Sequence, residues 1–194
     1  SWIPQTTVHS VDPNGCDFFK EIPDNLEISP FTTSWIVNTP NEKLFKGLYK
    51  IPEAYDKWIK KQTSDLEVLS QEHKVQGKLN LENCNHINRR IIEGIEFLQN
   101  NSIAAEAFRL ANAAMALQNS WIPERKASDL KWRPFQLGFI LLTIASLSDE
   151  TNRYRNTMDL LWFPTGGGKT EAYLALIAYI SFYRRLKEPD NPDN

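Results

Sequence analysis

The glycine-rich stretch Pro-Thr-Gly-Gly-Gly-Lys-Thr-Glu at residues 164–171 restricts the fold of this chain more than any other feature. It contains the second half of the phosphate-loop pattern, G-K-[ST], which requires a strand before the loop and a helix after it. Mostly apolar residues precede it at 158–163, and a helix-compatible run follows it. The sequence therefore predicts a short buried strand at 158–163, a glycine loop at 164–168 and a helix at 169–186.

Each residue type in this loop has a physical role in binding phosphate. Gly166, Gly167 and Gly168 would let the backbone turn tightly, so that successive N–H groups point at phosphate oxygens. The N-terminus of the following helix adds partial positive charge at the same place. Lys169 would reach the β- and γ-phosphates of ATP, and the hydroxyl of Thr170 would bind Mg²⁺.

Two features limit what the loop alone implies. The full pattern has glycine at the position of Phe163, so a flexible glycine turn before an ordinary helix is the alternative interpretation. Hydrolysis also needs a later carboxylate that holds Mg²⁺ and an arginine that stabilises the developing charge. The residues after Lys169 supply one helix and a short polar tail, with no acidic motif. We therefore expect a truncated nucleotide-binding domain with no ATPase activity of its own.

The rest of the chain is predominantly helical in pattern. Apolar residues recur every three or four positions on helices expected at about 53–73, 81–99, 102–118 and 134–147. Gly77 is expected to end the first of these, and Ser102 to cap the third. Residues 1–40 are rich in Pro, Asn, Asp and Thr, which favours irregular structure with one or two short strands.

These patterns predict a mostly α fold: a helical N-terminal region followed by the first strand, phosphate loop and first helix of a truncated RecA-like α/β domain. The expected divisions are an irregular segment at 1–50, a helical domain at 51–125, and the start of the ATP-binding domain at 126–194.

Composition excludes several other classes of protein. A net charge of −2 and a pI near 6.0 argue against a free-standing polybasic nucleic-acid module. Cys16 and Cys84 lie far apart with no CxxC companion, which argues against a disulfide scaffold or a zinc site and fits the reducing cytoplasm. The longest mostly apolar run, residues 137–147, is too short to span a bilayer. His9, His73 and His86 have no ligand spacing.

Two segments resemble a known family of proteins. Residues 164–171 are similar to the first motif of superfamily 2 helicases and translocases. Arg133-Pro134-Phe135-Gln136 resembles the segment that precedes this motif and reads adenine in many of those proteins. More narrowly, residues 132–136, 159–174 and 107–112 look like parts of the large helicase subunit of DISARM-type anti-phage defence systems.

The resemblance implies ATP-driven movement on DNA by two RecA-like domains, within a multi-subunit prokaryotic complex in the cytoplasm and not on a membrane. It implies that ATP and Mg²⁺ are cofactors, and that DNA and other complex subunits are partners of the full-length protein. Lys169 and Thr170 would be the catalytic residues, with Thr170 as the metal ligand and Gln136 at the adenine edge. The implied nucleotide site consists of Gln136, Pro164, Thr165, Gly166, Gly167, Gly168, Lys169, Thr170 and Glu171.

Simpler interpretations stand beside these. The helical region at 53–118 is also compatible with an interaction module that docks partner subunits or DNA, with the loop belonging to another class of NTPase. Gln136 is equally compatible with a solvent-facing residue at a helix start. Trp132 and Arg133 are typical of a packing anchor with a snorkelling neighbour. The basic side chains of Arg184, Arg185 and Lys187, near a helix C-terminus, complement the helix dipole.

Overall fold

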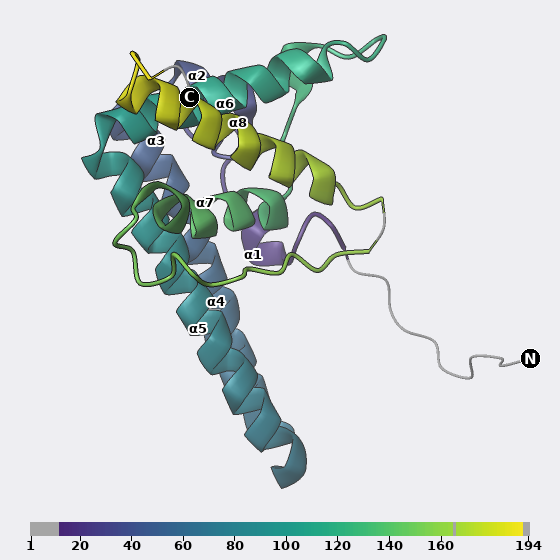
Figure 1. Ribbon diagram of the computed structural model, residues 1–194. Coiled ribbons are helices and arrows are strands. Elements are labelled where there is room, and N and C mark those ends of the chain that lie inside the picture. Colours follow the sequence, from purple (N-terminus) through teal and green to yellow (C-terminus); the bar gives the residue numbers. More distant parts are fainter. Residues whose placement is uncertain (1–11, 165, 192–194) are drawn as a thin grey trace, which may run out of the picture.

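The computed structural model describes residues 12–164 and 166–191, and all regular structure in this part is helical (Figure 1). The elements are α1 (Asp17–Lys20), α2 (Thr33–Asn38), α3 (Asn41–Leu48), α4 (Lys50–Asp65), η1 (Leu66–Val68), α5 (Gln71–Asn100), α6 (Ser102–Asn119), η2 (Ala127–Asp129), α7 (Pro134–Ser148) and α8 (Lys169–Lys187). Within these residues the one β-type contact is an isolated bridge between Thr32 and Lys131.

The N-terminal segment differs from the prediction. Its described part forms three helices, α1 to α3, where irregular structure with short strands was expected. The short helix α2 depends on a distant residue, because Arg109 of α6 donates hydrogen bonds to the carbonyls of Ile36 and Val37 at 2.7 and 3.0 Å. These carbonyls lie at the helix end, where backbone acceptors lack helical partners. No local sequence pattern could reveal this support.

Helices α4 and α5 form a projecting hairpin, which we call the stem (Figure 1). The predicted helix at 53–73 instead ends at Asp65, and the chain breaks at Ser70, whose ψ of 156° is extended. Gly77 does not end a helix; it lies inside α5, which continues through the helix predicted at 81–99. A Cβ at Gly77 would lie 2.4 Å from Leu66 Cδ2, so glycine permits η1 to pack closely against α5.

Helices α6, α7 and α8 agree closely with the sequence prediction. Their patterns are long and unbroken, which makes such elements the most readable in a sequence. The cap of α6 was wrong by one residue, because the Oδ1 of Asn101 accepts the hydrogen bond from the Ala104 N–H at 3.0 Å. Asn is as good an N-cap as Ser, so adjacent candidates cannot be separated by residue type.

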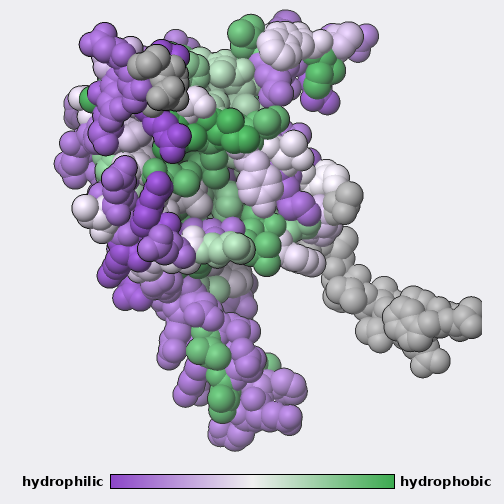
Figure 2. Space-filling view, viewed as in Figure 1, coloured by the Kyte–Doolittle hydropathy of each residue, from purple (hydrophilic) through white to green (hydrophobic). Residues whose placement is uncertain are grey.

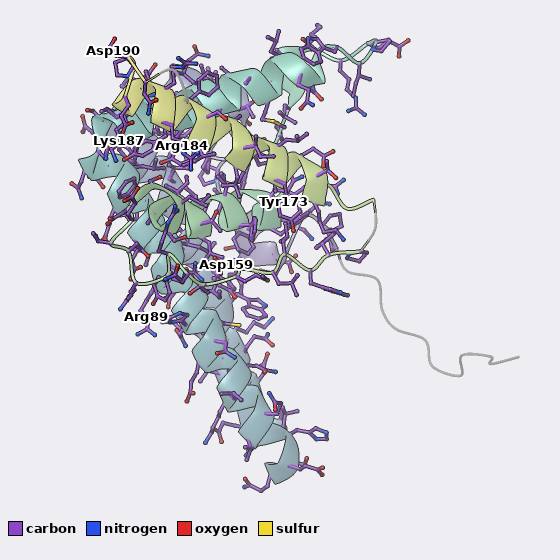
Figure 3. All side chains as sticks on the ribbon, in the orientation of Figure 1. Arg89, Asp159, Tyr173, Arg184, Lys187 and Asp190 are labelled. Carbon is purple, nitrogen blue, oxygen red and sulfur yellow. The ribbon has the colours of Figure 1, made fainter. Side chains whose placement is uncertain are left out.

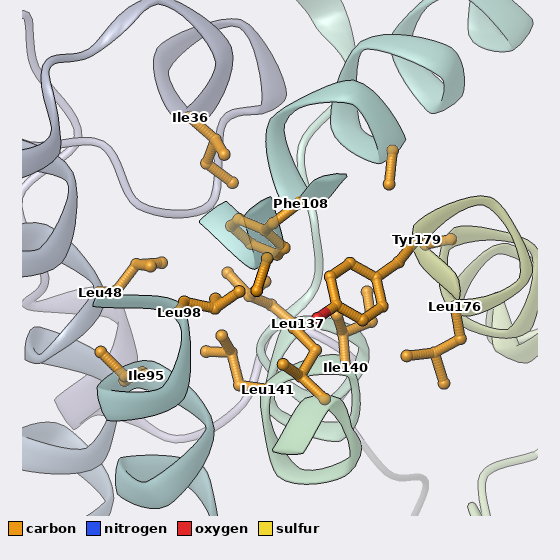
Figure 4. Close-up of a cluster of buried hydrophobic side chains, with 14 of the residues drawn as sticks. Ile36, Leu48, Ile95, Leu98, Phe108, Leu137, Ile140, Leu141, Leu176 and Tyr179 are labelled. Atoms are coloured by element: carbon orange, nitrogen blue, oxygen red, sulfur yellow. The ribbon is translucent and has the colours of Figure 1, made fainter. Parts of the chain in front are cut away.

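One hydrophobic core joins helices from every part of the described chain (Figure 4). The predicted apolar face of α5 is confirmed where Ile91, Ile95 and Leu98 are buried. Gly94 lies on the same helix where α5 meets α7, and a Cβ there would be 1.8 Å from the Leu141 carbonyl oxygen. Tyr179 of α8 is fully buried and its hydroxyl is 2.7 Å from the Ser148 hydroxyl, while burial raises its pKa.

The predicted strand at 158–163, and with it the start of a RecA-like α/β domain, is wrong for this chain. These residues belong to a segment, residues 149–163, that we call the strap; it crosses α5 and runs beside α7 without forming a strand (Figure 1). A strand requires another strand to pair with, whereas the helices beside the strap already pair their own backbone groups. The described residues therefore form no sheet.

The surface is uneven in hydropathy. Figure 2 shows hydrophobic residues gathered over α8, while the stem is mostly hydrophilic with a smaller apolar spot near its end. Ile177 on α8 and Val75 and Leu79 on the stem are exposed apolar residues. Among the described helices, none combines the length and the apolar character needed to cross a bilayer.

Candidate functional site

The glycine loop connects the end of the strap to the N-terminus of α8. Gly166 and Gly168 have φ angles of 80° and 92°, in the left-handed region that favours glycine. A Cβ at Gly166 would meet nothing within 4 Å, so the loop is open on that side. Gly168 is the N-cap of α8 and offers no side chain to the first-turn N–H groups, which leaves them available to an anion. Thr165 lies outside the described residues.

The start of α7 supports this loop with two polar side chains. Arg133 Nη1 donates to the Gly167 carbonyl at 2.6 Å, and Gln136 Nε2 donates to the Gly168 carbonyl at 2.7 Å. Gln136 Oε1 in turn accepts from the backbone N–H of Arg133 at 2.8 Å. The structure thus brings Gln136 to the glycine loop, where it is only 5% exposed and both amide atoms contact the protein.

Lys169 is the first residue of α8, and its side chain turns back to the strap. Its Nζ donates to the Phe163 carbonyl at 2.5 Å, and the side chain is half-buried. A phosphate bound at the loop would have to take the ammonium group from this carbonyl. Thr170 and Glu171 are exposed in the first turn of the helix.

Two aromatic rings lie beneath the loop. Phe135 and Phe163 stack with centroids 4.0 Å apart and planes 8° from parallel. Phe163 also lies under Gly167, where a Cβ would be 2.1 Å from the ring. Beside these rings, the strap, α5 and α7 line an apolar pocket of about 360 Å³.

An ion pair between Arg90 and Asp159 attaches the strap to α5, a few residues before the glycine loop begins. The two guanidinium nitrogens Nη1 and Nη2 of Arg90 donate to the two carboxylate oxygens of Asp159 at 2.6 and 2.7 Å. The Arg90 side chain is 4% exposed and that of Asp159 is 15% exposed, so the pair is largely shielded from water. Asp159 lies where the strap crosses α5 (Figure 3). A bidentate pair of this kind fixes orientation as well as distance.

Cation–π contacts add to this anchor. The guanidinium groups of Arg90 and Arg153 lie 4.4 and 4.7 Å from the centre of the Tyr154 ring. Arg153 also pairs with Glu93 of α5 at the surface. Arg155 donates to the Ser146 and Leu147 carbonyls at the end of α7, which ties the first part of the strap to that helix.

Metal ligands are sparse around this region. In residues 12–164 and 166–191, no cluster of three His, Cys, Asp or Glu side chains could hold a metal ion. His73 contacts the Ser70 hydroxyl, and the His86 ring lies edge-on to Tyr154. His9 lies outside the described residues. Thr170 stays the predicted Mg²⁺ ligand, and in such sites the nucleotide phosphates and water supply most of the other oxygens.

The sequence interpretation missed several residues that hold the loop. Arg133 and Phe135 were placed in a segment that resembles an adenine-reading one, with a snorkelling Arg133 as the simpler alternative, and neither was expected to hold the loop. Arg90 and Asp159 were given no role. The spacing of Arg133 and Gln136 on one helical turn was a usable signal, because residues three apart lie on one face. The contacts of Arg90 with Asp159 and of Phe135 with Phe163 join distant parts of the chain, and no spacing rule points to them.

Fold and site together define a helical domain that carries a G-K-[ST] loop at a helix N-terminus, supported by the start of a second helix. No model of a known protein family matches the chain. The chain is similar to the DISARM protein DrmA of Bacillus paralicheniformis, with 38% identity over 153 residues. The similarity covers 72% of this chain and 13% of that protein, so the chain corresponds to a small part of its relative's length. The chain is therefore a DISARM-related protein.

Proposed function

We propose that this chain is the ATP-binding, N-terminal portion of a longer ATP-dependent DNA helicase or translocase that acts in a prokaryotic anti-phage defence complex. The observation that carries the proposal is the convergence of two segments far apart in the sequence. The start of α7, with Arg133 and Gln136, holds the carbonyls of Gly167 and Gly168 next to the N-terminus of α8. The similarity to DrmA supports the biological setting.

The chemistry of the site fits a nucleotide phosphate. The N-terminal N–H groups of α8 supply donors and partial positive charge, and Lys169 supplies a full charge beside them. Gly166 leaves space above the loop. Pro164, Thr165 and the glycines would form the cradle, and Lys169 would hold the β- and γ-phosphates. Bound Mg²⁺ would neutralise developing charge on the phosphates, and Thr170 would be its protein ligand.

The remaining roles belong to the same proposal. Gln136 would contact the adenine edge with the second N–H of its amide, since the first is engaged by Gly168. Glu171, in the exposed first turn of α8, would lie beside the metal ligand. DNA and further subunits would bind the longer protein. A cytoplasmic location is also proposed, and the free state of Cys16 and Cys84 agrees with it.

The test compares nucleotide stabilisation of the longer protein and its Lys169→Ala variant. Ligand at about 100 times its dissociation constant stabilises a native-state binder by about 2.7 kcal/mol. Mg²⁺-ATP should therefore raise the melting temperature, and Lys169→Ala should lose most of that rise because it removes the cation of the phosphate site. Lys187→Ala removes a lysine from the far end of the same helix and should leave the rise intact. Equal rises in the wild type and Lys169→Ala would contradict the proposed site.

A second measurement concerns catalysis by this chain alone. We expect no phosphate release from ATP by the 194-residue chain, with or without DNA, because phosphoryl transfer needs a further carboxylate and arginine. Turnover that disappears in Lys169→Ala would show that the chain is catalytically complete.

The stem supports a second candidate, an interaction module that docks a partner subunit. Val68, Val75 and Leu79 are exposed near the end of the stem, which projects from the core (Figure 1). The double variant Val75→Ser, Leu79→Ser should weaken assembly with the other subunits while leaving the Mg²⁺-ATP stabilisation unchanged. Assembly unaffected by both substitutions would remove the stem from the proposed interface.

A further inference from the structure

We propose that Phe163 is a positioning residue of the nucleotide site, and that its stack on Phe135 holds the glycine loop in its binding shape. The proposal rests on the proposed function, because it names the residue that prepares that site. Phe163 stands where the full phosphate-loop pattern has glycine. The ring therefore replaces a flexible position with a fixed one.

The Phe163 ring contacts two parts of the molecule, the start of α7 and the glycine loop. One face stacks on Phe135 at 4.0 Å, almost parallel. The ring also contacts the backbone at Gly167, so closely that even a methyl group on Gly167 would lie 2.1 Å from it. The Phe163 ring thus contacts both the glycine loop and the first turn of α7.

The backbone of Phe163 makes a second contact with the site. Its carbonyl oxygen accepts the hydrogen bond from Lys169 Nζ at 2.5 Å. The ring connects Phe163 to α7 and to the glycine loop. The carbonyl holds Lys169 beside the loop in the free protein, and a bound phosphate would replace this hydrogen bond. Arg133 and Gln136 reach the loop from the same helix as Phe135, so the stack and these two hydrogen bonds fix the loop jointly.

The expected benefit is preorganisation. A glycine loop without support would have to be ordered when nucleotide binds, and that entropic cost would weaken binding. An aromatic pair adds a stabilisation that corresponds to about a twofold to tenfold change in an equilibrium constant. A ring that only filled space would change the stability of the free protein and leave nucleotide affinity unaltered.

The experiment measures the affinity of the longer protein for a slowly hydrolysed Mg²⁺-ATP analogue by calorimetry, together with the melting temperature without nucleotide. Phe163→Gly restores the glycine of the phosphate-loop pattern. We expect it to weaken binding by at least about twofold to tenfold, because the loop loses the ring contact and its backbone also gains freedom. Phe163→Tyr keeps the ring and should restore the wild-type affinity. Phe135→Leu removes the other half of the stack and should weaken binding by a similar factor.

The matched control is Trp162→Gly, which makes the same kind of change one residue earlier. Trp162 is 73% exposed, so its loss adds backbone freedom to the strap without removing a ring contact from the loop. We expect a change in affinity of less than about twofold. If Phe163→Gly unfolds the protein, the nucleotide affinity of Phe135→Leu tests the positioning role instead.

The results separate the two proposals. A wild type that does not bind the analogue overturns the proposed function, and the positioning role with it. A wild type that binds, with Phe163→Gly or Phe135→Leu no weaker than Trp162→Gly, overturns the positioning role alone. A lower melting temperature with unchanged affinity would also overturn it, because that pattern belongs to a residue that only packs.

Discussion

The helical core and the strap are stabilised by different kinds of contact. In the core, α5, α6, α7 and α8 bury long apolar side chains (Figure 4). At Gly94, α5 approaches the backbone of α7. In the last part of the strap, residues 158–163, exposed and partly buried side chains alternate. Three of its apolar residues face outward, and their exposed fractions are 93% for Met158, 84% for Leu160 and 73% for Trp162.

The difference shows where the stability of each region comes from. Burial of apolar area holds the core, and every buried residue there contributes through many small contacts. The strap instead depends on a few specific contacts: Arg90 with Asp159, Arg155 with the end of α7, and Phe163 with Phe135. Because the glycine loop follows the strap directly, the geometry of the candidate site is fixed by these contacts more than by the core.

The largest loss of stability should follow from adding a single methyl group at Gly94, where α5 approaches the backbone of α7. Gly94→Ala would place a Cβ 1.8 Å from the Leu141 carbonyl oxygen, so α5 and α7 would have to separate. We expect a loss of more than about 3 kcal/mol in the free energy of unfolding. Gly138→Ala is the control in α7, because a Cβ there would have Ile91 Cδ1, at 3.9 Å, as its one neighbour within 4 Å among the described residues. This substitution should stabilise the protein by about 0.5–1 kcal/mol, since alanine favours helix more than glycine does.

Chemical denaturation of the 194-residue chain measures both variants. If Gly94→Ala unfolded at the wild-type midpoint, the core would tolerate a separation of α5 and α7. Close helix packing would then not be what distinguishes the core from the strap.

The next effect concerns the strap. Asp159→Ala would leave the guanidinium of Arg90 buried without its carboxylate, which should cost about 3 kcal/mol in the free energy of unfolding. Glu93→Ala breaks the exposed pair with Arg153, which also joins the strap to α5, and should cost less than about 1 kcal/mol. Thermal unfolding distinguishes the two. Similar losses for both variants would mean that burial of the pair is unimportant and that the strap has no special anchor.

Most helices could be predicted from the sequence, and the errors share a cause. α6, α7 and α8 were readable because their residues favour helix locally and their apolar spacing is regular. α2 was missed because it depends on Arg109, which lies far along the chain. The strand at 158–163 was predicted because the phosphate-loop pattern presupposes a sheet, and the described residues supply no partner strand.

The candidate site was predictable to a similar degree. The motif predicted a phosphate site at the loop, Lys169 and Thr170, and the resemblance added Gln136; these roles stay predictions, while the structure does place Gln136 in contact with the loop. The support from Phe135, Phe163 and Arg90 depends on packing between distant segments. Such contacts follow from the fold, so a single sequence offers no local signal for them.

The smallest predicted effect concerns Asp149, where the strap leaves α7. Hydrogen bonds from the hydroxyl and backbone N–H of Thr151, at 2.7 and 2.8 Å, hold the pKa of the Asp149 carboxyl below its usual range. Such a turn should contribute less than about 1 kcal/mol, because the carboxyl is well solvated. Asp149→Ala should lower the free energy of unfolding by that amount at neutral pH.

The sign of the pH dependence follows from the direction of the shift. A carboxyl whose pKa is lowered in the folded state stabilises the protein above its unfolded pKa, about 3.9, and loses this contribution as the pH falls below it. The difference between wild type and Asp149→Ala should therefore be constant from pH 7 to about pH 5 and shrink toward pH 3. Asp149→Asn keeps an oxygen acceptor for Thr151 but does not titrate, so its difference from Asp149→Ala should not change with pH. A wild-type difference that also stays constant to pH 3 would show that the charge of Asp149 does not hold the start of the strap.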